Sequence, residues 1–282
     1  MAVGAALITV VVLAVGILRE RPVFEPGSKQ SINMWESVSS VLSNPHARLL
    51  AVVYFIEEGG KAIFPLMGVY YLQYVTRLHP GVASFVMLSY QFGSIASIPG
   101  WLLLARLMGK KGAWLIGMAV GIGAFSLGLP PLHPGFYPDD EDARLRFSLV
   151  SAALVGASNT CGQVIARSLM ADVIDWDEQQ TGCRREGAYF AFFNFLTKGA
   201  AGVGSALMGW LLGFAGFVPN VEQTMQVKFA MAFLFCLLPM VGLAVAIVLF
   251  RRFSLREGMP ERQPAVPYQP PRIVQTDDKA LM

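Results

Sequence analysis

The chain has 282 residues, of which 54% are hydrophobic and only 15% are charged. Soluble globular domains carry about a quarter of charged residues, so this composition excludes most soluble classes. The 22 basic and 19 acidic residues give a net charge of +3, which is too small and too evenly spread for a nucleic-acid-binding surface.

Apolar segments recur along the chain and are separated by short polar connectors. A helix that crosses a bilayer needs about 20 apolar residues. Segments of this kind lie at about 2–18, 49–76, 82–107, 113–130, 145–171, 187–214 and 226–250. They predict an all-α integral membrane protein with about seven transmembrane helices.

The two ends of the chain differ in character. The first apolar run has no basic residue before it, whereas Arg19 and Arg21 follow it, which is the reverse of a signal peptide. We therefore expect residues 1–18 to be a retained transmembrane helix. Residues 253–282 are Pro-rich and polar, a composition typical of a disordered tail.

The basic residues of the connectors predict the orientation in the membrane. Fifteen Lys and Arg residues lie in the first, third and fifth connectors and the tail, and only four lie in the other connectors. Lys and Arg accumulate on the cytoplasmic side. The C-terminus is then cytoplasmic and the N-terminus outside. Five further helices before this chain would make its first helix the sixth of twelve and place both ends of the whole protein in the cytoplasm.

Lys198 lies about eleven residues, or roughly 16 Å, into the sixth apolar segment, near the middle of the membrane. An ionisable residue at this depth is a candidate for function. It shares a helix face with Asn194, and the small residues Ala201, Ser205, Gly209 and Gly213 repeat at every fourth position. Because such stripes allow close helix packing, we expect Lys198 to face protein or a cavity. The alternative is a lysine that extends to the cytoplasmic interface.

A second charged group lies within the segment 49–76. Glu57 and Glu58 precede Lys61 by four and three residues, so either carboxylate can reach the ammonium on one helix turn. One carboxylate remains without a partner, and desolvation favours its protonation, as a proton-coupled site requires. A structural ion pair beside an internal water cavity is the alternative interpretation.

The fifth connector carries the densest charge pattern of the chain. Its acidic and basic residues are candidates for a cytoplasmic gate held closed by salt bridges, and a solvated loop remains the alternative. These gate candidates are Asp172, Asp175, Asp177, Arg184 and Arg185. Asp172 and Asp175 continue the helical face at the cytoplasmic end of the fifth segment, and Gly182 is expected to break the chain before the next helix. The spacing does not fit a calcium-binding loop.

Catalytic and metal-binding patterns are not found in the sequence. The three cysteines follow no pairing or zinc spacing, and His46, His79 and His133 occur singly at loops or segment ends. We therefore expect a protein that is not an enzyme, with no metal site and no cofactor.

The run from Ala171 to Asn220 resembles the glycoside/pentoside/hexuronide:cation symporters, the melibiose-permease branch of the major facilitator superfamily. The similarity lies in an ADVxDxxE pattern, a TGxRxEG turn and a helix with a central lysine that ends in GFxPN. The NPHARLL and RLMGKKG stretches also resemble this family, so the likeness spans nearly the whole chain before the tail.

This resemblance implies a fold of two six-helix halves that bind a solute between them and work by alternating access. The chain would supply helices six to twelve: the sixth helix (1–18), the cytoplasmic middle loop (19–48) and the second six-helix bundle (49–252), followed by the tail (253–282). The coupling cation, sodium or proton, would find its main ligands in the missing first half, and Lys198 would meet the cation and sugar region.

Three functions remain open at this point. The first is part of a cation-coupled sugar symporter in the plasma or inner membrane. The second is a carrier of a lipid or another organic solute with the same fold. The third is a truncated product that is inactive without the N-terminal half.

Overall fold

The computed structural model describes residues 34–129, 140–182 and 184–254. These residues form helices joined by short turns, and no strand occurs among them. The chain divides into two units, residues 1–37 and 38–282, and the second holds nearly all of the described residues.

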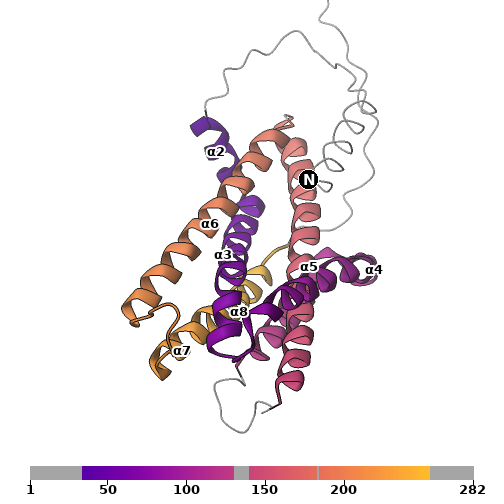
Figure 1. The fold of residues 1–282 in the computed structure, drawn as a ribbon. Helices are drawn as coiled ribbons and strands as arrows, with labels where there is room; N and C mark the ends of the chain where they lie inside the picture. The colour runs from indigo at the N-terminus through magenta and orange to yellow at the C-terminus, as the bar shows by residue number, and fades with distance from the viewer. Residues whose placement is uncertain (1–33, 130–139, 183, 255–282) are drawn as a thin grey trace, which may run out of the picture. The chain divides into compact units, whose positions relative to one another are not determined.

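Nine helical elements make up the described part of the chain (Figure 1). In order they are α2 (Met34–Ser43), α3 (Pro45–Tyr74), η1 (Pro80–Val82), α4 (Ala83–Ser126), α5 (Glu141–Thr181), α6 (Glu186–Phe214), α7 (Met225–Ala232), η3 (Phe233–Leu237) and α8 (Leu238–Phe250). By length and composition, α4, α5, α6 and the continuous stretch Met225–Phe250 are able to cross a membrane. The all-α membrane fold expected from composition is confirmed.

The six apolar segments predicted from residue 49 onward are all helical. Two of them, 82–107 and 113–130, form the single element α4, which is interrupted at Gly109. This residue has φ 80° and ψ 160°, a conformation that only glycine adopts readily, and it separates two helical arms. The predicted helix 1–18 and the tail from residue 255 lie outside the described residues.

Several helices are longer than their apolar segments. Within the predicted loop 19–48, α2 forms a further helix and α3 begins at Pro45, because the Asn44 side chain accepts hydrogen bonds from two backbone N–H groups and caps α3. The helix α5 extends through the charged connector to Thr181, and Gly182 ends it with φ 70°, as predicted.

The long helices pack in close pairs. The helix α5 runs against both arms of α4, while α3 packs against α6 and α8. Glycines set the approach of α4 to α5: a Cβ at Gly93 would overlap the carbonyl of Ala153, and one at Gly156 would overlap the carbonyl of Tyr90. Small residues allow this backbone contact in membrane helices.

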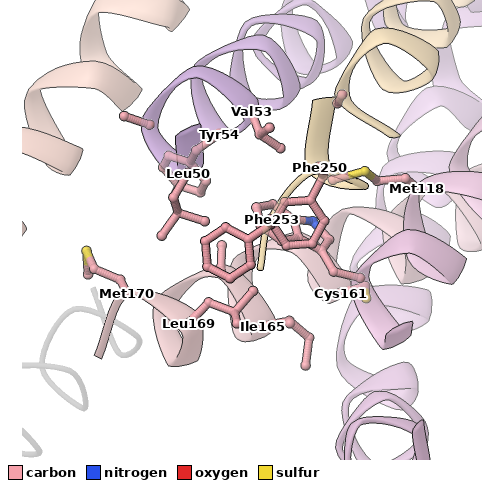
Figure 2. Close-up of a cluster of buried hydrophobic side chains, with 14 of the residues drawn as sticks. Leu50, Val53, Tyr54, Met118, Cys161, Ile165, Leu169, Met170, Phe250 and Phe253 are labelled. Carbon is pink, nitrogen blue, oxygen red and sulfur yellow. The ribbon is translucent and has the colours of Figure 1, made fainter. Parts of the chain in front are cut away.

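The largest buried cluster joins α3, α4, α5 and the end of α8 (Figure 2). Phe250 packs edge-on against Trp114 at 4.5 Å between ring centroids and stacks on Phe253 at 5.1 Å. Phe253 is 1% exposed, so the packed bundle continues one residue beyond the predicted boundary at 252.

Candidate functional site

A buried ion-pair triad forms in the middle of α3. The Lys61 Nζ lies 2.8 Å from Glu57 Oε1 and 3.1 Å from Glu58 Oε1. The side chains of Glu57, Lys61 and Glu58 are 3%, 10% and 12% exposed. The spacings of four and three residues bring the ammonium to the carboxylates as expected. The expectation that one carboxylate remains without a partner is wrong, because the single ammonium lies within ion-pair distance of both.

Glu57 is the more enclosed carboxylate of the triad. The indole Nε1 of Trp114, on the second arm of α4, donates a 3.0 Å hydrogen bond to Glu57 Oε2. A Cβ at Gly162 of α5 would overlap Glu57 Oε1 and lie 2.8 Å from Lys61 Nζ. Glycine at position 162 therefore allows α5 to cover the triad.

The triad is also linked to α5 and to the first arm of α4. The Lys61 Nζ donates to the Asn159 carbonyl oxygen at 3.4 Å. The Asn159 Nδ2 in turn donates to the Tyr90 hydroxyl at 3.1 Å. These bonds fix Lys61 on the side that faces both carboxylates.

Glu58 and Lys61 line a cavity of about 460 Å³. Its other walls combine polar and aromatic side chains from four helices. The lining residues are Ala62, Phe64, Pro65, Met87, Tyr90, Gln91, Gln163, Thr197 and Ala201. The rings of Phe64 and Tyr90 stack on each other at 4.8 Å between centroids, so two aromatic side chains line the cavity beside amides and a carboxylate. These groups suit a solute with both hydroxyls and apolar faces.

Lys198 and Asn194 lie on an exposed face of α6. On a helix of 100° per residue, this face adjoins the one that carries Thr197 and Ala201 into the cavity. Lys198 makes no salt bridge within the described residues. It is thus placed beside the cavity without a carboxylate partner from this bundle.

The small-residue stripe on α6 is not the surface that contacts this bundle. Ser205 is exposed, and a Cβ at Gly209 or Gly213 would have nothing within 4 Å. The contact with α3 is made instead through Gly204, where a Cβ would lie 3.0 Å from the Gly59 carbonyl oxygen. Small residues occupy two faces of this helix, so their periodicity alone does not select the packed one.

The gate candidates form ion pairs at the charged, C-terminal end of α5. Asp172 binds Lys110, which follows the Gly109 interruption of α4, at 2.6 Å. Arg185 binds Asp177 through two nitrogens, and the Asp177 side chain is 5% exposed. Both acidic residues thus find partners within this bundle.

Arg184 forms ion pairs with three carboxylates at the surface. Its guanidinium lies 3.0 Å from Asp175, 2.6 Å from Glu178 and 3.2 Å from Glu186, and all four side chains are at least 40% exposed. The hydrogen bonds that its guanidinium donates to these carboxylates raise the pKa of Arg184 above its ordinary value. Such an exposed cluster is well hydrated and stabilises the fold little.

The same end of the bundle gathers the start of α3 and the end of α8. The Asn44 Nδ2 donates to the Tyr189 hydroxyl of α6 at 3.0 Å. Lys111 donates to the carbonyls of Arg251 and Phe253, which caps the C-terminal end of α8. The basic connectors that predicted the orientation therefore meet at one end of the helices.

Sequence reasoning missed several residues of the triad and the cavity, above all Trp114, Gly162, Gln163 and Tyr90. One signal was available. A tryptophan in an apolar run needs an acceptor for its indole N–H, and the segment 49–76 offered the carboxylates. The sequence did not predict that Lys110 pairs with Asp172, although Lys110 is one of the basic connector residues that predict the orientation.

Long apolar helices able to cross a membrane, with a buried ion-pair triad beside a cavity that four helices line, define a multi-pass membrane protein as the class. The chain belongs to the family of MFS/sugar transport proteins, whose model matches residues 1–257. The resemblance to the melibiose-permease branch is confirmed, and the members of this family are transporters rather than enzymes.

Individual relatives agree with this assignment. The chain is 27% identical to the symporter YjmB of Bacillus subtilis over 233 residues, which are 81% of this chain and 48% of that protein. It is 24% identical over 229 residues to the isoprimeverose transporter of Lactiplantibacillus pentosus, or 78% of this chain and 44% of that protein. It is also 24% identical over 257 residues to the sodium-dependent lysophosphatidylcholine symporter 1 of Xenopus tropicalis. Those residues are 88% of this chain and 46% of that protein. The chain spans about half the length of these relatives.

Proposed function

We propose that this chain is the C-terminal part of a secondary active transporter that carries a sugar or glycoside together with a cation, sodium or proton, by alternating access. The observation that carries the proposal is the 460 Å³ cavity, where Glu58, amides and two aromatic side chains meet inside a bundle of the sugar-transport family. Carboxylates and amides bind sugar hydroxyls, and aromatic rings pack against the apolar face of a sugar ring.

Transport requires a second helical half in this proposal. The relatives are about twice as long as the stretch that this chain matches, and alternating access needs two bundles that rock around a shared site. The coupling cation then takes its main ligands from that other half. Lys198 and Asn194, exposed beside the cavity, are the residues of this chain that would face it.

In the same proposal, the gate candidates hold the cytoplasmic side of the carrier closed. Asp172, Asp175 and Asp177 would exchange their present partners for basic residues of the other half when the cytoplasmic side closes, with Arg184 and Arg185 released in the exchange. Reversal of the charge of Asp172 in the assembled carrier should then shift its population toward the inward-facing state. Unchanged distances across the cytoplasmic face in Asp172→Lys would leave the pairs with a structural role only.

The tail beyond Arg252 lies in the cytoplasm in this proposal, and the protein resides in the plasma or inner membrane. The distribution of basic residues supports it, because Lys110, Lys111, Arg184, Arg185 and Arg251 belong to one end of the bundle. A single cysteine at Ser254, in a background depleted of other cysteines, should resist an impermeant maleimide in intact cells. Strong labelling without permeabilisation would contradict this orientation.

The function is tested by uptake into vesicles that contain this chain together with the half that completes it. Labelled glycosides and a lysophospholipid are offered under an imposed sodium or proton gradient. We expect accumulation of a glycoside that collapses when the gradient is abolished. Uptake of the lysophospholipid alone would reassign the carrier to lipids, and no gradient-dependent uptake of any solute would refute symport.

A further inference from the structure

The two carboxylates of the triad have different surroundings, which assigns them different tasks. We propose that Glu58 is a proton-binding site in this half of the carrier and that Glu57 is the permanent counter-ion of Lys61. The inference rests on the proposed function, because it adds a proton site in this half to the cation ligands expected in the other half.

The triad carries more negative than positive charge. Glu57 and Glu58 share the single ammonium of Lys61, and all three side chains are at most 12% exposed. With both carboxylates ionised, the triad keeps one uncompensated negative charge among apolar helices. Such a charge is expensive to bury, and uptake of one proton removes it.

The two carboxylates differ in their partners and in their access to water. Glu57 accepts hydrogen bonds at both oxygens, from Lys61 and from the Trp114 indole, and α5 covers it at Gly162. The ammonium and the indole N–H both stabilise the ionised carboxylate of Glu57 against the cost of its burial. Glu58 lines the cavity instead, so protons in water can reach it.

The position of Lys61 favours a proton over a metal cation at Glu58. The Lys61 Nζ lies 3.1 Å from Glu58 Oε1, so a sodium ion at Glu58 would meet a neighbouring positive charge. A proton binds one carboxylate oxygen and needs no further ligands. The binding step is carboxylate plus proton to carboxylic acid, and it leaves Glu57 and Lys61 as a neutral pair.

Tyr54 of α3 interacts electrostatically with Glu58 and with Arg167 of α5. Tyr90 of α4 lines the same cavity as Glu58, Cys161 of α5 interacts with Glu57 and Lys61, and Lys198 follows the cavity-lining Thr197 on α6. Arg167 and Lys198 are exposed, and neither forms a salt bridge with Glu58 in the described part of the chain. Lys61 is therefore the cation that sets the charge of this site.

Protonation also changes what the cavity offers to a solute. The ionised Glu58 only accepts hydrogen bonds, whereas the protonated form donates one as well. A hydroxylated solute beside Tyr90 and Gln163 would then meet a donor in place of a charge. Proton occupancy and solute binding would thus be linked at one side chain.

The test is chemical labelling with dicyclohexylcarbodiimide, an apolar reagent that modifies protonated carboxyl groups within membranes. Membranes that contain the full chain are treated over a range of pH, and peptide mass spectrometry locates the modified glutamate. We expect modification of Glu58, increasing as the pH falls, and none of Glu57. Modification of Glu57 in preference to Glu58, or no modification of Glu58 at any pH at which the protein stays folded, would overturn the proposal.

Glu57→Gln is the matched variant. It preserves the shape of the side chain and an acceptor for Trp114, but it leaves Glu58 alone with Lys61, so labelling of Glu58 at a given pH should fall several-fold. Equal labelling in this variant would also overturn the proposal, and the pH profile of the parent decides the matter should Glu57→Gln fail to fold. Labelling reads proton occupancy without solute movement, so its outcome is independent of whether the uptake experiment succeeds.

Discussion

The ion pairs of this protein fall into two groups with opposite surroundings. Lys61 binds Glu57 and Glu58 inside the helical bundle, where their side chains are 3% to 12% exposed. Arg184 binds three carboxylates at the charged end of α5, where the side chains are 40% to 51% exposed. Each cluster carries more carboxylates than cations, yet water screens the second and is largely excluded from the first. The comparison teaches that burial, rather than the number of pairs, decides which cluster matters for stability and for transport.

Removal of the buried cation should have the largest effect on stability. Lys61→Met leaves Glu57 and Glu58 buried without an ammonium, and breaking a buried pair costs about 3–5 kcal/mol. Thermal unfolding of the detergent-solubilised protein measures the loss. Lys198→Met is the control, because Lys198 is exposed and makes no salt bridge among the described residues. Equal melting temperatures for both variants would refute the buried triad.

A single methyl group at Gly162 should disturb the same site. In Gly162→Ala the new Cβ would lie 2.8 Å from both Glu57 Cδ and Lys61 Nζ, so the helices or the ion pair must shift. Overpacking of this kind costs about 1–3 kcal/mol. Gly202→Ala serves as the comparison, because a Cβ there has nothing within 4 Å. Equal stability of the Gly162→Ala and Gly202→Ala proteins would show that α5 does not pack closely against the triad at position 162.

The exposed cluster should respond weakly. Arg184→Ala removes three ion pairs together, but exposed pairs contribute about 0–1 kcal/mol each and often nothing measurable. We expect a fall in unfolding free energy well below that of Lys61→Met, and smaller still at high salt. A loss as large as that of Lys61→Met would mean that burial does not separate the two groups.

Lys198 should affect transport while leaving stability almost unchanged. Its ammonium makes no salt bridge among the described residues, so it is expected to compete with the coupling cation for the negative groups of the other half. Lys198→Ala should therefore reduce accumulation against a gradient at normal surface expression, and Lys198→Arg should rescue poorly because its guanidinium is planar. Accumulation equal to that of the parent in Lys198→Ala would leave this lysine without a coupling role.

The helices were predictable because hydropathy reports directly on burial in lipid, and every predicted segment from residue 49 onward is helical. The pairing of Lys61 was predictable too, since its partners lie within one turn of the same helix. The distinction between Glu57 and Glu58 was not, because it depends on Trp114 and Gly162, which approach from other helices. Contacts between segments distant in sequence leave no periodic signal.

The face of α6 that packs on α3 shows the same limit. Small residues follow two faces of this helix, and the Ser205, Gly209 and Gly213 face points away from the described bundle. The selection of Gly204 depends on the shape of α3 around Gly59. A pattern within one helix indicates where close contact is possible, but the neighbouring helix decides where it occurs.

The most direct test of this account compares the assembled parent carrier with Glu58→Gln under an imposed inward proton gradient, with surface expression measured in parallel. The variant keeps the Glu57–Lys61 pair and a polar cavity wall but has no proton to gain or lose at position 58. We predict that the parent accumulates its glycoside and that Glu58→Gln only equilibrates it across the membrane. Accumulation by Glu58→Gln to the level of the parent would contradict the account.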